Sequence, residues 1–440
     1  MNQRTRALIH RSRTIVLPVL ASAIAFAADP TIALYRFQGA SDGSNPQANL
    51  IADRAGNLYG TTEYNGAGGY YGTVFKLTPP SSPGGTWTET TLYSFGNHGD
   101  GARPTAGLVF DHSGRLYGTA SDSNAGGYGE VFQLSPPAAG EGPWTETVLY
   151  SFQGGKDGSY PFGNVIFDPA GSLYGTTESS VFELSPPAQS GAAWNFKVLH
   201  NFACCTADGW NSVAGLVRDQ QGNLYGTTEW GGSYTGLDCA SLGCGTVFEV
   251  SPPAVAGGPW TETVLHSFND QPDGLNPLTN LTLDLAGNLY GSTYGGGVLG
   301  GGMAFELSPP AMPGSQWTES VLHNFSYSAG DGAVPSALIF SPAGSLYGVT
   351  RFGGNSCVFN ATNYGCGIVF ELVPPGASGG AWTEILLHRF TFGGASPEQP
   401  VAGLTFDKTG KLYGTTTYGG LNKCADDGSD GCGTVFEVGQ

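Results

Sequence analysis

No stretch of this 440-residue sequence shows the 3.6-residue spacing of apolar side chains that is typical of an amphipathic helix. Charged residues make up 12% of the chain, and 35 acids outnumber 17 bases. The acidic balance argues against the positively charged surface that nucleic-acid binding requires. The motifs G-x-S-x-G, H-E-x-x-H and the P-loop are also missing, so the sequence carries no known catalytic signature and predicts no cofactor.

Long apolar runs are missing too, apart from one at the N-terminus. Ile15–Phe26 follows a segment with four arginines and ends in a small-residue cleavage pattern before Ala28. This arrangement predicts a signal peptide over residues 1–27 and a secreted protein, either extracellular or periplasmic. The run is short for a membrane anchor and no second one follows, so no membrane span is expected after cleavage. Without residues 1–27 the net charge is −22, from 13 bases and 35 acids.

Glycine (71 residues), proline (28) and aromatic residues (12%) are plentiful, and the aromatics recur at fixed places. Two short motifs each occur seven times. Leu-Tyr-Gly begins at Leu58, Leu116, Leu173, Leu224, Leu289, Leu346 and Leu412. Leu-(Tyr/His)-x-Phe begins at Leu34, Leu92, Leu149, Leu199, Leu265, Leu322 and Leu387. Spacings of 51 to 66 residues between Leu-Tyr-Gly motifs are too irregular for fixed solenoid rungs but suit blades with variable loops.

Each unit reads as four short strands, here called a to d. In the second unit we expect strand a at 106–110, b at 115–119, c at 129–134 and d at 144–152. A D-x-x-G turn joins a to b, and a Pro-rich segment joins c to d. Four strands repeated seven times predict an all-β, seven-bladed β-propeller of four-stranded antiparallel blades over residues 31–440, with an open β-solenoid as the alternative.

The last unit lacks strand d, which stands alone at 31–37 before the first unit. We therefore expect this N-terminal strand to complete the last blade and close the ring. A closed ring has no open blade edge, so a monomer is expected. The predicted blades are 49–95, 106–152, 163–202, 214–268, 279–325, 336–390, and 402–438 with 31–37.

The repeated text G-L-x-x-D-x-x-G-x-L-Y-G-T-T, followed by G-T-V-F-E-L-S-P-P and W-T-E-T-V-L-Y-S-F, resembles the GloVer repeat of exported bacterial "choice-of-anchor" tandem-repeat proteins. The resemblance covers nearly all of the chain after residue 27. It implies no established activity and no catalytic residues. Family members are named for varied C-terminal surface anchors, whereas this sequence ends two residues after Val438, which favours a freely secreted or periplasmic protein.

Strand alternation places all b–c and d–a connections on one face of the ring. These connections vary between units, while the a–b and c–d connections are nearly uniform, so we expect function on the b–c/d–a side, called the variable face below. Three cysteine pairs lie within single b–c loops and predict local disulfides: Cys239–Cys244, Cys357–Cys366 and Cys424–Cys432. Adjacent Cys204 and Cys205 are expected to form either a vicinal disulfide or two free thiols.

Two repeated features are open to a functional interpretation, Ca²⁺ binding for the first and catalysis for the second, and no metal is predicted. Asp-Gly recurs in six d–a connections, where it suits either a scaffold turn or a weak Ca²⁺ site; the turn is favoured because Asp-x-Asp clustering is missing. His200, His266, His323 and His388 occupy strand-d positions that hold Tyr in other units, which indicates packing rather than catalysis.

Aromatic residues amid glycine in the variable loops suggest contacts with an extracellular glycan or protein. The candidate binding residues cluster in units one and four: Glu63, Tyr64, Tyr70, Tyr71, Trp210, Glu229, Trp230 and Tyr234. Two function classes follow. The favoured one is a non-enzymatic exported recognition module, and the alternative is a hydrolase or lyase acting on an extracellular polysaccharide with acids such as Glu63 and Glu229.

Overall fold

A computed structural model gives the fold of the chain. It describes residues 32–439 except 68, 97–98, 124–126, 139, 141, 190, 205, 234–238, 240–241, 256, 313, 329, 355–357, 360–361, 378–379, 392–396, 421–423 and 425–430. The predicted signal peptide therefore lies outside the described residues. Within the described part, no helix has the length and apolar character needed to cross a membrane.

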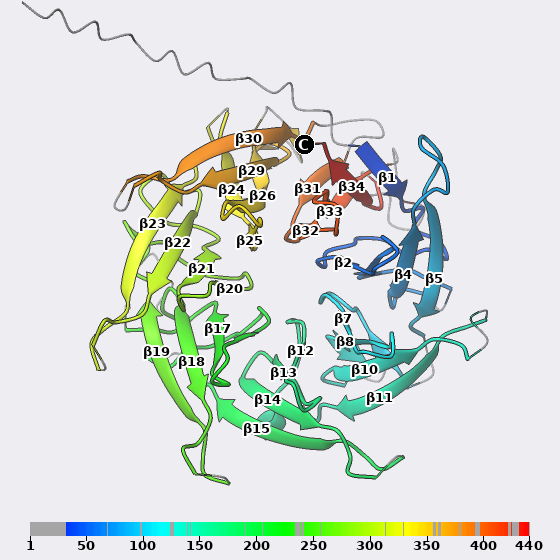
Figure 1. Cartoon of the computed structure of the whole chain (residues 1–440), viewed down its shortest axis with the longest axis horizontal. Coiled ribbons are helices and arrows are strands. Elements are labelled where there is room, and N and C mark those ends of the chain that lie inside the picture. The colour runs from blue at the N-terminus through cyan, green and yellow to red at the C-terminus, as the bar shows by residue number, and fades with distance from the viewer. Residues whose placement is uncertain are drawn as a thin grey trace, which may run out of the picture.

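Seven antiparallel sheets stand around a central axis and form a seven-bladed β-propeller (Figure 1). The first four blades, with strands in the order a to d, are the following. Blade 1 is β2 (Ile51–Ala52), β3 (Leu58–Thr62), β4 (Thr73–Thr78) and β5 (Thr88–Ser94); blade 2 is β7 (Val109–Phe110), β8 (Leu116–Ala120), β10 (Glu130–Ser135) and β11 (Thr145–Ser151); blade 3 is β12 (Ile166–Phe167), β13 (Leu173–Thr176), β14 (Ser180–Ser185) and β15 (Asn195–Asn201); blade 4 is β16 (Val217–Arg218), β17 (Leu224–Thr228), β18 (Thr246–Ser251) and β19 (Thr261–Ser267).

The remaining blades follow the same order, and blades 6 and 7 each carry one extra inner strand. Blade 5 is β20 (Thr282–Leu283), β21 (Leu289–Ser292), β22 (Met303–Ser308) and β23 (Thr318–Asn324); blade 6 is β25 (Ile339–Phe340) with β24 (Gly332–Pro335), β26 (Leu346–Gly353), β29 (Ile368–Val373) and β30 (Thr383–Arg389); blade 7 is β32 (Thr405–Phe406) with β31 (Pro397–Pro400), β33 (Leu412–Gly419), β34 (Thr434–Val438) and β1 (Ile32–Arg36). Two small hairpins, β6 (Gly101–Ala102) with β9 (Asp122–Ser123) and β27 (Val358–Phe359) with β28 (Thr362–Asn363), and the 3-10 turn η1 (Gly155–Asp157) lie in the connections.

The N-terminal strand closes the ring as the sequence predicts. β1 pairs antiparallel with β34, with Ile32 opposite Glu437 and Arg36 opposite Thr434. In Figure 1 the first strand and the C-terminus lie side by side in the same blade. The predicted seven-bladed fold and its closure are therefore confirmed.

Strand a is shorter than the sequence suggests, with two residues in each blade. Just before strand a, a backbone carbonyl group accepts a hydrogen bond from the preceding blade instead of extending the strand. Thr61 Oγ1 of blade 1 donates to the Ala106 carbonyl of blade 2 at 3.1 Å, and the fourth residue of the L-Y-G-T-T motif makes the same contact at five other junctions. In blade 6 this residue is Val349, which has no hydroxyl group to donate.

The core is built from phenylalanine pairs between neighbouring blades. The Phe that follows strand d of one blade meets the strand-c Phe of the next, with ring centroids 5.0 to 5.4 Å apart at all seven junctions. Phe37 from the N-terminal strand supplies this contact to Phe75 of blade 1. Edge-on ring pairs add to the hydrophobic gain of burial, so each junction is held by a specific contact as well as by buried area.

The Leu-Tyr-Gly motif serves this core and the adjacent turn. A Cβ on Gly60 would stand 2.7 Å from Phe75 and 2.9 Å from Leu50, so only glycine leaves room for the phenylalanine ring. Tyr59 donates from its hydroxyl to Asp53, whose carboxylate also accepts the backbone N–H groups of the a–b turn. These hydrogen bonds lower the pKa of Asp53 and explain the repeated D-x-x-G-x-L-Y-G text.

Replacing Phe37 by Ala should destabilise the ring by about 3–5 kcal/mol, because it removes a fully buried aromatic side chain from the closing junction. Ile32→Ala in the same strand is the control. Its side chain is exposed, so the change should cost less than about 0.5 kcal/mol. Denaturant unfolding of the two variants measures the difference, and equal stability of Phe37→Ala and the parent protein would show that β1 does not hold the ring closed.

Candidate functional site

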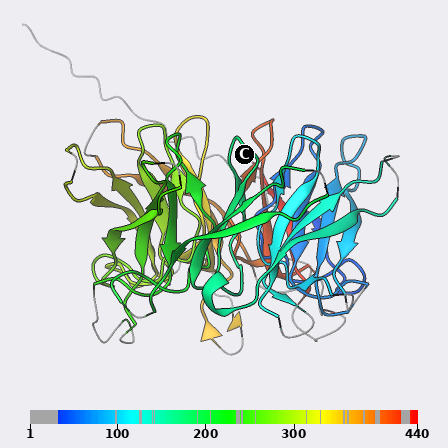
Figure 2. The ribbon, with the colours of Figure 1, turned by 90° about the horizontal axis from the view of Figure 1, so that it is seen from below.

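The two faces of the ring differ as the sequence predicts. The b–c and d–a connections emerge on one side of the disc, where the hairpin β27–β28 projects beyond the blades (Figure 2). The a–b turns and Pro-Pro connections emerge on the other. The side chains that differ between blades therefore lie mainly on the variable face.

Each d–a connection holds a non-glycine residue with positive φ at an equivalent position, beside the b–c loop. The set, in blade order from 1 to 7, is Asn45, Arg103, Tyr160, Asn211, Asn276, Val334 and Gln399, with φ between 52° and 61°. Asn tolerates this conformation, but Arg, Tyr and Val rarely adopt it. Seven different loops hold the backbone in one shape, and each presents a different side chain around the axis.

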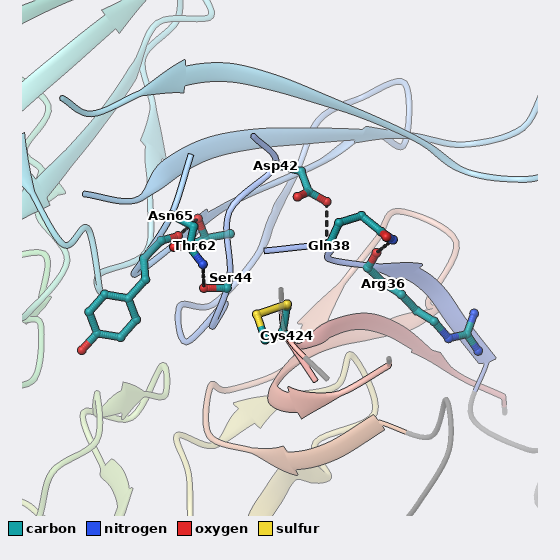
Figure 3. Close-up of a disulfide and its surroundings, with 9 residues drawn as sticks. Arg36, Gln38, Asp42, Ser44, Thr62, Asn65 and Cys424 are labelled. Atoms are coloured by element: carbon teal, nitrogen blue, oxygen red, sulfur yellow. Dashed lines mark hydrogen bonds between the residues drawn. A yellow bond between two sulfur atoms is a disulfide. The ribbon is translucent and has the colours of Figure 1, made fainter. Parts of the chain in front are cut away.

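The Asp-Gly text of the d–a connections forms a repeated clasp. Asp42 accepts a hydrogen bond from the Gln38 backbone N–H at 2.9 Å (Figure 3). It also accepts one from the Tyr35 hydroxyl at 2.9 Å. The corresponding pairs in the next five connections are Tyr93–Asp100, Tyr150–Asp157, His200–Asp208, His266–Asp273 and His323–Asp331. The aspartates therefore act as turn formers that tie each loop to strand d.

Two of the candidate acids are engaged by polar partners. Glu63 is buried, forms an ion pair with Arg103 of the next blade and accepts a hydrogen bond from Gln47. Arg103 also lies over the ring of Tyr64, 5.3 Å from its centroid. Glu229 accepts a hydrogen bond from Asn211, and burial raises its pKa. Both carboxylates thus help to fix the loops that carry them.

The candidate tryptophans pair with each other through the backbone. Trp210 and Trp230 exchange N–H···O bonds of 2.9 and 3.0 Å, joining the d–a and b–c connections of blade 4. Trp210 packs against the blade 3–4 core, and Tyr71 against the blade 1–2 core. Tyr234 lies outside the described residues. Among the aromatic candidates, Tyr70 presents the most surface, at 60% exposure.

Exposed aromatic side chains of the described chain all lie on the variable face. They are Tyr70, Tyr128, Tyr160, Tyr294, Tyr327 and Tyr364, at 37% to 60% exposure. Of these, only Tyr70 is among the candidate binding residues predicted from the sequence. The other five carry the same signal, an aromatic residue beside Gly or Ser in a variable loop.

Two groups of these rings form across blade junctions. Between blades 5 and 6, the ring centroids of Tyr327 and Phe352 each lie 5.8 Å from the ring centroid of Tyr364. Val298 and Leu299 are exposed in the b–c loop of blade 5, and the Val298 N–H donates to Asn324 at the end of strand d, close to where the d–a connection that carries Tyr327 begins. A second group at blades 2 and 3 contains Tyr128, Tyr160 and Phe162, with neighbouring centroids 6.2 Å apart.

Disulfides hold other loops of the variable face. Cys239–Cys244 and Cys424–Cys432 are bonded, with Cα atoms 5.0 and 4.8 Å apart; the latter is drawn in Figure 3. Cys204 and Cys366 are also disulfide-bonded. Their predicted partners, Cys205 and Cys357, lie outside the described residues.

The cavity on the ring axis is smaller than a typical ligand pocket. Residues from all seven blades, including Asn49, Asn164 and Asn280, line a space of about 160 Å³. Ligand pockets usually measure about 300–1,000 Å³. Larger grooves of about 900 and 630 Å³ lie on the opposite face at two junctions, beneath Trp87 and Trp194. Because they recur at equivalent places, these grooves belong to the scaffold.

Comparison with known proteins identifies the repeat. Residues 23–181 and 178–436 match the family model of the Gloeobacter/Verrucomicrobia repeat. The chain belongs to this family. The resemblance stated from the sequence is thereby confirmed. Among curated proteins, none matches the chain significantly.

Solved structures similar to this Gloeobacter/Verrucomicrobia repeat protein include PorZ of Porphyromonas gingivalis, a bacterial surface component of the type-IX secretion system, with 15% identity, a TM-score of 0.43 and coverage of 83% of this chain. The chain spans 45% of PorZ. A gluconolactonase from Xanthomonas campestris has 16% identity and a TM-score of 0.38, covering 74% of this chain and 82% of the lactonase. A putative glucose dehydrogenase from Thermus thermophilus has 17% identity and a TM-score of 0.41, and the match covers 72% of this chain and 94% of the dehydrogenase. At this level of similarity no activity is carried over.

Blade 2 begins strand c with an acid beside the variable face, where the other blades have Thr, Ser, Met or Ile. Glu130 replaces the Thr that begins strand c at Thr73, Thr246 and Thr434. It is buried next to Glu146 and Asp100, and its Oε1 accepts the Gly101 backbone N–H at 2.8 Å. Burial and the neighbouring acids raise the pKa of Glu130 to about 9 and that of Glu146 to about 7.

These raised values predict a protein that is more stable in mild acid. Between pH 4.5, the pKa of an unfolded glutamate, and the raised pKa values of the folded protein, the folded state binds more protons than the unfolded state. The free energy of unfolding therefore falls as the pH rises through this range. The contribution of the two protonated glutamates to stability is complete below about pH 4.5. Melting temperatures should fall between pH 5 and pH 9. Glu130→Thr, which introduces the residue that blades 1, 4 and 7 use here, should weaken this dependence, and an unchanged pH profile in that variant would contradict the assignment.

Proposed function

We propose that this protein is an exported recognition module that binds an extracellular glycan, without turning it over, on its variable face. The observation that carries the proposal is the distribution of exposed aromatics. All six exposed aromatic side chains of the described chain are tyrosines in b–c or d–a loops. Tyrosine offers a flat apolar ring and a hydroxyl group, the combination that suits sugar rings edged with hydroxyl groups.

The rigidity of the loops supports the same proposal. Disulfides, the Trp210–Trp230 backbone pair and the Glu63–Arg103 ion pair fix the loops before a ligand arrives. A preformed surface loses less conformational entropy on binding than a flexible one. The strongest part of the surface is the group at blades 5 and 6, where exposed Tyr327 and Tyr364 stand together with Phe352.

The proposal places the protein outside the cytoplasm, on the basis of the predicted signal peptide and of disulfides in the variable loops. A monomer in solution fits a closed ring.

Replacing Tyr327 and Tyr364 by Ala should weaken binding of a glycan identified on a glycan array by at least about tenfold. The reason is that each contact between a tyrosine ring and a sugar ring is expected to contribute roughly 1 kcal/mol. Both side chains are nearly half exposed, so melting should change little. Leu285→Ala, on an a–b turn of the opposite face, is the control. Isothermal titration of the three proteins measures the effect.

The other outcomes are distinct. Capture of a secreted protein in place of a glycan, lost in the same tyrosine variant, would keep the face and change the ligand class. Turnover of a polysaccharide that disappears in Glu229→Gln would support a hydrolase or lyase instead. Binding that survives the tyrosine changes but is lost in Leu285→Ala would contradict the assignment of the face.

A further inference from the structure

The strand-d clasps differ between blades in the side chain that faces the aspartate. In three consecutive clasps this residue is a histidine: His200 with Asp208, His266 with Asp273 and His323 with Asp331. In each case a glutamate from strand d of the next blade, Glu262, Glu319 or Glu384, completes the cluster. The same three-residue set therefore occurs at the junctions of blades 3–4, 4–5 and 5–6.

The donor atoms of each cluster lie close enough to share one ion. One ligand atom from each of the three side chains falls within 4.8 Å of the other two. In the cluster at blades 5–6, His323 Nε2 lies 3.4 Å from Asp331 Oδ1 and 3.9 Å from Glu384 Oε2. Ligands about 2.1 Å from a tetrahedral zinc ion are roughly 3.4 Å apart, so small side-chain rotations suffice.

The clusters also contain an unmet polar group. One carboxylate oxygen of each glutamate, Oε1 of Glu262, Glu319 and Glu384, is buried and has no hydrogen-bond partner in the described structure. Buried carboxyl oxygens without a partner are costly, and two carboxylates in one cluster repel each other. Oε1 of Glu146, beside Tyr93, is likewise buried without a partner in the described structure, so this cost is shared by the glutamate position and is not specific to the histidine clusters. A divalent cation would balance the charges of the two carboxylates.

We propose that these three His–Asp–Glu clusters are divalent transition-metal sites, with Zn²⁺ as the fitting ion, that tie neighbouring blades together. A neutral imidazole nitrogen and two carboxylate oxygens form a ligand set that zinc accepts, and a water completes the coordination. Each ion joins strand d of one blade to strand d of the next. The three sites together clamp blades 3 to 6, which carry the tyrosine group at blades 5 and 6.

The other clasps of the chain provide matched controls. Tyr93 takes the histidine position beside Asp100, with Glu146 close by, so this cluster lacks the nitrogen ligand. The side chain of Tyr150 stacks on Phe196, which stands where the glutamate would be. His388 has the histidine, but the residues that would supply its aspartate, 392–396, contain no Asp.

Zinc titration of the metal-stripped protein, followed by calorimetry and by metal analysis after dialysis, tests the proposal. The parent protein should bind three ions. His266→Tyr, which restores the residue used by blades 7, 1 and 2, should bind two, and Glu319→Gln should weaken the same site. Tyr93→His should add a fourth ion, and His388→Tyr should leave three.

Thermal melting gives a second readout. Zinc should raise the melting temperature of the parent protein, and the rise should be smaller in His266→Tyr. Zinc uptake that His266→Tyr and Glu319→Gln leave unchanged would overturn the proposal, as would the absence of uptake at neutral pH in a correctly folded protein. None of these outcomes depends on a glycan, so the proposed function stands or falls separately.

Discussion

The propeller depends on one contact made seven times, the phenylalanine pair between neighbouring blades. Strand d ends with a Phe whose ring meets the strand-c Phe of the next blade, and both rings are almost fully buried. The glycine of Leu-Tyr-Gly leaves the space that the strand-c ring fills, and the threonine after it bonds to the next blade. Adjacent blades are thereby fixed to each other before any loop is considered, and the loops are free to differ.

Much of this architecture follows from the sequence because repetition makes the pattern visible. The seven copies of two landmarks predict the blade count, and the isolated Leu34-Tyr35-x-Phe37 text predicts the closing strand. The two faces also follow, since strand alternation alone decides which connections meet. The length of strand a did not follow, because its first residues bond to the neighbouring blade instead of continuing the ladder.

The site could be predicted only as a face. Side chains such as Glu63 and Arg103 are 40 residues apart and meet because they come from adjacent blades, which no local pattern reveals. Exposure is equally non-local. Trp210 is partly covered by the blade 3–4 core, whereas Tyr327 remains exposed, although both stand in d–a loops. For the same reason the His–Asp–Glu clusters were invisible as units, since the glutamate arrives from the following blade.

The pairing of β1 with β34 sets the order in which the molecule can be completed. β1 can pair only after β34, some 400 residues later in the chain, has been synthesised. Phe37 can pack at the closing junction only then. Until then blade 7 lacks its outer strand and Phe75 its partner ring. Contacts between segments so distant in the chain form slowly and leave apolar surface open meanwhile. A chain cut short anywhere before β34 keeps that apolar surface exposed, so the closing junction is buried only when all seven blades are present.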